Sequence, residues 1–172
     1  MRLVTLSALA TFALDQATKL AVVQGLRLID RGVIEVLPPY LVFRMAWNQG
    51  VNFGLFAHGA DWVRWVLVAV SLAISAWVWM WIRREGAKPL AQISGGILIG
   101  GALGNVVDRV VYGAVADFLN MSCCGFDNPY AFNVADIAIF AGAAGLVLFT
   151  ETGKPKGSGK PKPPRKPRTK AP

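Results

Sequence analysis

The chain has 172 residues, which is enough for one domain. Hydrophobic residues make up 54% and charged residues only 16%, whereas about 25% charged is usual in soluble domains. The composition therefore argues against a soluble protein with a large core. The net charge is +8, but residues 151–172 hold eight Lys/Arg and one Glu and carry +7 of it.

Four segments are long and apolar enough to cross about 30 Å of hydrocarbon, namely residues 3–23, 62–82, 90–112 and 133–150. We interpret the first segment as a membrane helix and not as a cleaved signal peptide. Asp15 and Lys19 interrupt it, and no small-x-small cleavage site follows. The predicted fold class is an all-α polytopic membrane protein with four transmembrane helices and a small extracytoplasmic β-rich subdomain.

The basic residues predict the orientation in the membrane. Arg2, the pair Arg83 and Arg84, and Lys88 fall on the same side as the tail if there are four spans, and that side should be cytoplasmic. Both termini are then inside, and residues 24–61 and 113–132 lie outside.

The chain divides into a membrane domain, residues 1–150, and a tail, residues 151–172. The tail is rich in Pro, Lys and Gly, so we expect it to be disordered and drawn to anionic lipid headgroups. Nucleic-acid binding is not expected, because no aromatic residue interleaves the basic ones.

The segment 24–61 is too patterned for a plain linker. "VIEVL" alternates loosely, Pro38 and Pro39 turn the chain, and "YLVFRMAW" is rich in strand-forming residues. "NQGVNFGLF" follows. We predict a small β-rich subdomain on the outer face of the membrane.

Residues 90–112 carry a row of small residues. Gly96, Gly100 and Gly104 form a repeated small-xxx-small face, which lets another helix approach closely. Asp108 continues this row four residues later. It is therefore predicted to face protein and not lipid.

Charged residues within the first and third predicted helices are spaced to form pairs. Asp15 and Lys19 stand at i and i+4, and pairing lowers the cost of burying each charge, about 2.5–3.5 kcal/mol on insertion scales. Asn105, Asp108 and Arg109 stand at i, i+3 and i+4. We expect a self-neutralising Asp108–Arg109 cluster that fixes helix packing.

Two further aspartates flank the predicted outer loop 113–132. Asp117 follows Gly113, a predicted helix end, and no basic residue lies between positions 112 and 154. Asp136 lies three residues after Asn133, a spacing that also fits a helix cap. The predicted helix at 90–112 runs outward and the one at 133–150 runs inward, so both aspartates are expected at similar depth on the outer face.

Two close carboxylates cannot both ionise cheaply, so one keeps a proton near neutral pH. One can then activate a water while the other donates a proton, as in aspartic proteases. Asp117 is the expected proton holder and Asp136 the expected base.

Other chemistries have weaker support in the sequence. There is one histidine, His58, no H-E-x-x-H motif and no G-x-S-x-G elbow, and the adjacent Cys123 and Cys124 lack zinc-site spacing. The sequence therefore argues against a zinc protease and against a serine hydrolase of the G-x-S-x-G type. The alternatives are a small proton or ion transporter that uses intramembrane aspartates, and a catalytically silent scaffold subunit.

Four motifs resemble those of the lipoprotein signal peptidases, also called signal peptidase II, in order and in spacing. They are "LDQATK" at 14–19, "NQGVNFGLF" at 48–56, "GNVVDRVVYGAVADF" at 104–118 and "FNVADIAI" at 132–139. The resemblance covers nearly the whole chain except the basic tail. Asn52 departs from it, since the family commonly has a small residue there.

This resemblance implies an aspartic endopeptidase of the bacterial inner membrane. It would cleave diacylglyceryl-modified prolipoproteins just before the lipidated cysteine, with its active site on the extracytoplasmic face. The resemblance implies no metal, no organic cofactor and no obligate protein partner. By motif, the catalytic pair is Asp117 and Asp136. The resemblance also implies residues that support the site or contact substrate: Asp15, Lys19, Asn48, Gly50, Asn105, Asp108, Arg109, Asn133 and Ala135.

Overall fold

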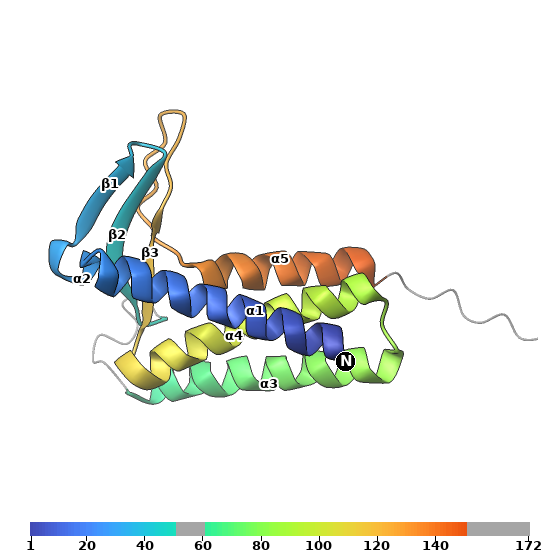
Figure 1. The fold of residues 1–172 in the computed structure, drawn as a ribbon. Helices are drawn as coiled ribbons and strands as arrows, with labels where there is room; N and C mark the ends of the chain where they lie inside the picture. Colours follow the sequence, from blue (N-terminus) through green and yellow to red (C-terminus); the bar gives the residue numbers. More distant parts are fainter. Residues whose placement is uncertain (51–60, 151–172) are drawn as a thin grey trace, which may run out of the picture.

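A computed structural model describes residues 1–50 and 61–150 of the chain (Figure 1). Its four long helices lie beside one another: α1 (Arg2–Lys19), α3 (Asp61–Glu85), α4 (Pro89–Tyr112) and α5 (Val134–Phe149). A π-helical segment, η1 (Leu20–Gly25), prolongs α1, and a single turn, α2 (Leu28–Arg31), precedes the sheet. The predictions for Asn52, His58 and the basic tail fall outside the described residues.

Three helical stretches in the described part of the chain are long and apolar enough to span a membrane. They are Arg2–Gly25, Trp62–Glu85 and Pro89–Tyr112, each of 24 residues. Helix α5 is apolar but has 16 residues, so it is about 24 Å long against about 30 Å of hydrocarbon. The predicted fourth span stays a prediction.

Helix α4 packs against α1, α3 and α5, and its glycines allow the close approach. Gly96 and Gly100 face α1, and Gly101 faces α5. A Cβ on Gly100 would lie 2.4 Å from the carbonyl oxygen of Ala8, and one on Gly101 would lie 2.6 Å from that of Ala135. The small-residue face predicted from the sequence therefore does pack against a helix.

Local sequence signals define the ends of α4 and α5. Pro89 occupies the first turn of α4, where its missing N–H costs nothing, and Gly113 ends the helix with φ of 84°. Asn133 caps α5: its side chain accepts from the backbone N–H of Asp136, whose own side chain accepts from the backbone N–H of Asn133. The capping arrangement considered for Asp136 is confirmed.

A three-stranded antiparallel sheet lies at one end of the bundle (Figure 1). Its strands are β1 (Val33–Leu37), β2 (Leu41–Asn48) and β3 (Val115–Asn120), in the order β1-β2-β3. Strands β1 and β2 form a hairpin within the predicted β-rich subdomain, with Pro38 and Pro39 in the connection.

Strand β3 corrects the sequence-based view of residues 113–132 as a loop. It pairs with β2, with Ala46 opposite Asp117. Phe118 is 1% exposed and packs in one cluster with Val23 and Leu28, which fixes β3 against η1 and α2. The segment becomes a strand because burial and pairing with β2 stabilise it, and neither is visible in a stretch of six residues.

Candidate active site

The two aspartates predicted as a catalytic pair belong to one hydrogen-bonded network at the sheet end of the bundle. Asp117 lies on β3 and Asp136 in the first turn of α5. Asn133 Nδ2 donates to Asp117 Oδ1 at 2.6 Å and to Asn105 Oδ1 at 3.2 Å. Asn105 Nδ2 in turn donates to Asp136 Oδ1 at 2.9 Å. Side-chain amides thus join the two carboxylates without a break.

The amides that contact Asp117 are held in one orientation. Asn48 Oδ1 accepts the backbone N–H of Gly50 at 2.8 Å, so its Nδ2 faces Asp117 Oδ2, at 3.0 Å. The φ of Gly50, 85°, suits glycine and allows this turn. Asn133 Oδ1 is likewise used by the helix cap. A proton on Asp117 must therefore occupy a lone pair that neither amide uses.

Asp117 is 2% exposed, and its surroundings favour the protonated form. Burial raises the pKa of Asp117 from its ordinary value of 3.8 to about 6, and the charge of Asp136 acts in the same direction. The hydrogen bonds from Asn48 and Asn133, and the charge of Lys19, oppose this rise. A carboxyl that keeps a proton near neutral pH needs such a raised pKa.

The raised pKa of Asp117 predicts a pH-dependent stability. The pKa of Asp117 is higher in the folded state than in the unfolded state. The contribution of its protonated form to the free energy of unfolding is therefore fully present below about pH 4, and it is lost as the pH rises through about 6. The change from 3.8 to about 6 corresponds to on the order of 3 kcal/mol. Asp117→Asn should therefore gain stability relative to wild type by about this amount between pH 4 and pH 8, measured by unfolding in mixed micelles.

Asp127 provides the matched control, because it is an exposed aspartate in the loop after β3. The difference in stability between Asp127→Asn and wild type should be the same at pH 4 and at pH 8. If the stability difference between Asp117→Asn and wild type is the same at both pH values, the raised pKa of Asp117 is contradicted.

Lys19 forms the charged centre of the network, and it corrects one predicted pairing. Its Nζ lies 2.8 Å from Asp15 and 2.8 Å from Asp108, and all three side chains are buried. The Asp15–Lys19 pair is confirmed, but the predicted Asp108–Arg109 pair is wrong. Consecutive helical residues project in different directions, so Asp108 reaches across to Lys19 on α1.

Arg109 instead lies near Asp117 and Asp136. Its Nη1 donates weakly to the carbonyl oxygen of Asn105, at 3.4 Å, and the acidic charges that act on it most are those of Asp136 and then Asp117. Its Nε is buried and has no hydrogen-bond partner within the described part of the chain. Buried donors without a partner are uncommon in folded proteins.

Ala135 has no polar side chain, and it takes part in the network through its backbone. Its N–H donates to Asp15 Oδ1 at 2.9 Å. The predicted site residues therefore include side chains and backbone groups, and the structure brings all of them to one end of the bundle.

Comparison with known proteins identifies the family. The sequence model of the family described as signal peptidase (SPase) II matches residues 7–151. The chain belongs to the signal peptidase II family. Membership makes it a protease, and this disfavours the transporter alternative.

The relatives agree with this assignment. The chain is 47% identical to a lipoprotein signal peptidase of Methylorubrum extorquens (strain PA1), over 81% of this chain and 80% of that protein. It is 42% identical to a lipoprotein signal peptidase of Methylobacterium sp. (strain 4-46), over 88% of this chain and 90% of that protein. The solved structure of a bacterial membrane enzyme superposes with a TM-score of 0.69 at 26% identity, and the match covers 84% of this chain and 90% of that one.

Sequence reasoning on this signal peptidase II chain missed Gln16. Its Nε2 donates to Asp15 Oδ2 at 3.1 Å, to Asp108 Oδ1 at 3.3 Å and to the carbonyl oxygen of Gly104 at 3.4 Å. The residue stands inside the quoted motif "LDQATK". Its position next to Asp15 was the available signal, but the partners on α4 become visible only in the fold.

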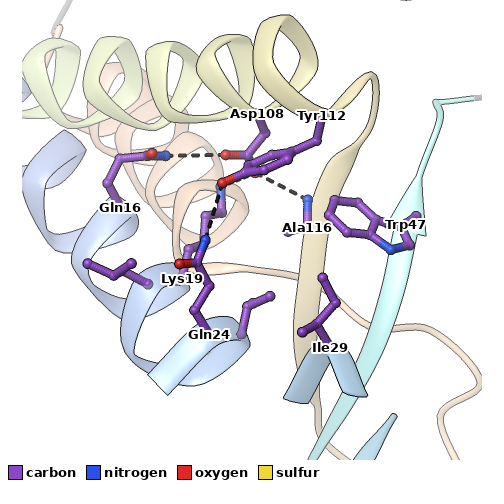
Figure 2. A pocket seen from close by; sticks show the side chains of 10 residues that line it. Gln16, Lys19, Gln24, Ile29, Trp47, Asp108, Tyr112 and Ala116 are labelled. Atoms are coloured by element: carbon purple, nitrogen blue, oxygen red, sulfur yellow. Dashed lines mark hydrogen bonds and ion pairs between the residues drawn. The ribbon is translucent and has the colours of Figure 1, made fainter. Parts of the chain in front are cut away.

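A cavity of about 230 Å³ lies between η1, the end of α4 and the sheet (Figure 2). Trp47 and Tyr112 form one side of it, with ring centroids 5.7 Å apart, and Ala116 forms another. Side chains alternate along a strand, so the cavity lies on the opposite face of β3 from Asp117. Neither Asp117 nor Asp136 is among the residues that line it.

Asp136 instead lines an open apolar groove of about 610 Å³ along α5, together with Phe132, Ile137, Phe140 and Ala141. Ile137 and Phe140 are exposed. Over the described ranges 1–50 and 61–150, no group of three or more His, Cys, Asp or Glu is placed to hold a metal.

Proposed function

We propose that this chain removes the signal peptide from diacylglyceryl-modified prolipoproteins, by cleaving just before the lipidated cysteine. The observation that carries the proposal is the pair Asp117 and Asp136, held by one amide network at the end of a membrane helix bundle. The curated relatives are named lipoprotein signal peptidases, which supports this substrate.

In the proposed mechanism the two carboxyls divide the acid and base roles. Asp136 is the base: it accepts hydrogen bonds from Asn105 and from the backbone of Asn133, and the dipole of α5 favours negative charge in its first turn. Asp136 takes a proton from a water that attacks the scissile carbonyl carbon. Asp117 gives its proton to the carbonyl oxygen, so that a tetrahedral intermediate with two hydroxyl groups forms. When its C–N bond breaks, the leaving amine receives the proton held by Asp136, and one hydroxyl returns a proton to Asp117 as the new carboxyl group forms.

The surroundings of the pair suit a lipid-modified substrate. The groove beside Asp136 is apolar and lies on the outside of α5, so acyl chains can remain in lipid while the peptide bond reaches the carboxyls. Arg109 Nε has no hydrogen-bond partner among residues 1–50 and 61–150, and in this proposal it binds a substrate carbonyl near the pair. Water reaches an interfacial site more easily than one at the bilayer midplane.

A cleavage assay tests this proposal. The purified full chain, in liposomes, should release a signal peptide from lipid-modified prolipoprotein, and mass spectrometry should place the new N-terminus at the modified cysteine. The same prolipoprotein without its lipid should be cleaved at least about tenfold more slowly, because binding energy from the lipid is lost. Equal rates on both substrates, or cleavage at another bond, would overturn the proposal.

The proposed topology places both termini in the cytoplasm and the catalytic pair on the extracytoplasmic face. Reporters fused after Lys88 and after Asn128 should therefore report opposite sides, the first inside and the second outside. A fusion after Glu85 is the control and should agree with the one after Lys88. The proposed location of the site fails if the reporters after Lys88 and Asn128 lie on the same side.

A further inference from the structure

Lys19 occupies the centre of the polar network, although in the described part of the chain it bonds to neither Asp117 nor Asp136. An ammonium group has three N–H donors. The partners of Lys19 Nζ are Asp15 Oδ2 at 2.8 Å, Asp108 Oδ2 at 2.8 Å and Asn105 Oδ1 at 3.3 Å. Lys19 is 6% exposed and uses all three donors, so it is not free to act as an acid toward a substrate.

The first partner leads to the helix that carries Asp136. Asp15 Oδ1 accepts the backbone N–H of Ala135, the residue directly before Asp136. The N–H groups in the first turn of a helix have no partner within that helix. Asp15 therefore supplies, from α1, a hydrogen-bond acceptor for the first turn of α5.

The second partner leads to the strand that carries Asp117. Asp108 Oδ2 accepts the backbone N–H of Ala116 at 3.1 Å, and Ala116 directly precedes Asp117. The third partner, Asn105, is turned by Lys19 so that its Nδ2 faces Asp136. The residue before Asp117 and the residue before Asp136 thus each donate a backbone N–H to a carboxylate that is bound to Lys19.

We propose that Lys19 is a positioning residue that fixes the separation of Asp117 and Asp136 by locking the two carboxylates that hold β3 and α5. The inference rests on the proposed function, because it assigns Lys19 a part in that reaction. The two segments belong to different elements, so contacts between elements set the distance between the carboxyls. These two backbone contacts act beside the amide of Asn133, which binds Asp117 directly. A misplacement of about 1 Å costs a reaction about 10²-fold in rate.

An alternative is that Lys19 acts only through its positive charge on the pair. A neutral version of the network separates the two explanations. In Asp15→Asn/Lys19→Met/Asp108→Asn, the new amide oxygens can still accept from Ala135 and Ala116. Gln16, with its amide turned over, then offers its oxygen to both new amide groups. The backbone contacts persist while the charges are gone.

The hydrogen-exchange rates of the Ala116 and Ala135 backbone amides test the positioning role, and this measurement does not require the protein to be active. In protein labelled at both alanine and leucine, in micelles, Lys19→Met should speed exchange at both Ala116 and Ala135 by at least about tenfold, because their acceptors are no longer locked. The triple variant should return both amides to within about threefold of wild type. The amide of Leu119, which donates to Phe132 at 2.8 Å on the same strand, is the internal control and should not change.

Cleavage kinetics complete the test. Lys19→Met should lower kcat by about 10²-fold with KM changed less than about threefold, and the triple variant should regain at least about tenfold of the lost kcat. Unchanged exchange in Lys19→Met would overturn the proposal. A triple variant with restored exchange and the kcat of Lys19→Met would overturn it too, because the charge would then be what matters.

Two outcomes need separate interpretation. If Lys19→Met fails to fold, the triple variant decides: native exchange with kcat near wild type supports positioning, and native exchange with a 10²-fold loss, about the cost of misplacement, contradicts it. If wild type cleaves no lipid-modified prolipoprotein, the proposed function is wrong. The exchange data then still decide whether Lys19 holds the two segments.

Discussion

Asp117→Asn is expected to lower kcat for prolipoprotein cleavage by about 10³–10⁴-fold, because an amide cannot transfer the proton that the mechanism assigns to Asp117. The fold should survive. Asn is close in size to Asp and avoids the burial of an ionised carboxylate, although its NH₂ then faces the NH₂ of Asn48 or of Asn133, which costs one hydrogen bond. KM should change little, because the substrate still meets the same groove and Arg109. Single-turnover cleavage of the lipid-modified substrate measures the effect.

Asp136→Asn should be at least as damaging, since Asp136 is the proposed base and also accepts the backbone N–H of Asn133 at 3.1 Å. Asp127→Asn is the matched control on the exposed loop, and its rate should equal that of wild type. Near-normal cleavage by either dyad variant would show that the pair does not carry the reaction.

Gly142→Leu is expected to prevent α5 from docking on α4. A Cβ at Gly142 would lie 2.6 Å from the backbone nitrogen of Leu98 and 2.7 Å from the carbonyl oxygen of Ser94. Backbone atoms of α4 cannot move aside as a flexible side chain can. Overpacking typically costs about 1–3 kcal/mol, and a leucine adds three further carbons to that first clash. The free energy of unfolding should fall by at least about 3 kcal/mol.

Two companion variants calibrate this result. Gly142→Ala gains about 1 kcal/mol of helix propensity, yet its Cβ meets the same backbone, so we expect a net loss of stability. Ala144→Leu places an equal bulk on the exposed face of α5 and should be neutral. Equal stability of Gly142→Leu and Ala144→Leu would contradict the packing described for α5.

Local patterns allowed much of the architecture to be predicted. Hydrophobic runs located the helices, although α5 is shorter than the other three. The i,i+4 spacing of Asp15 and Lys19 and the Asn-x-x-Asp cap at Asn133 were both predicted, because each is a contact within a few residues of the chain. The row of small residues on α4 indicated a close helix partner without saying which one.

Contacts between distant segments were the part that could not be predicted. The pairing of β3 with β2 joins residues about seventy positions apart, and six residues of mixed character gave no strand signal. The partner of Asp108 was assigned wrongly because its neighbour Arg109 was close in sequence, while Lys19 came close only through the packing of α1 on α4. Gln16 was missed for the same reason.

The fixed amides near the pair also bear on how the site tolerates mutation. Asn48, Asn105 and Asn133 each use their oxygen elsewhere and turn their NH₂ toward a carboxylate. Asparagine becomes aspartate by a single base change in its codon, and the side chain keeps its size and shape. Here that change would replace a donor with a second negative charge facing the first. At these three positions, the substitution most alike in shape should therefore be among the least tolerated.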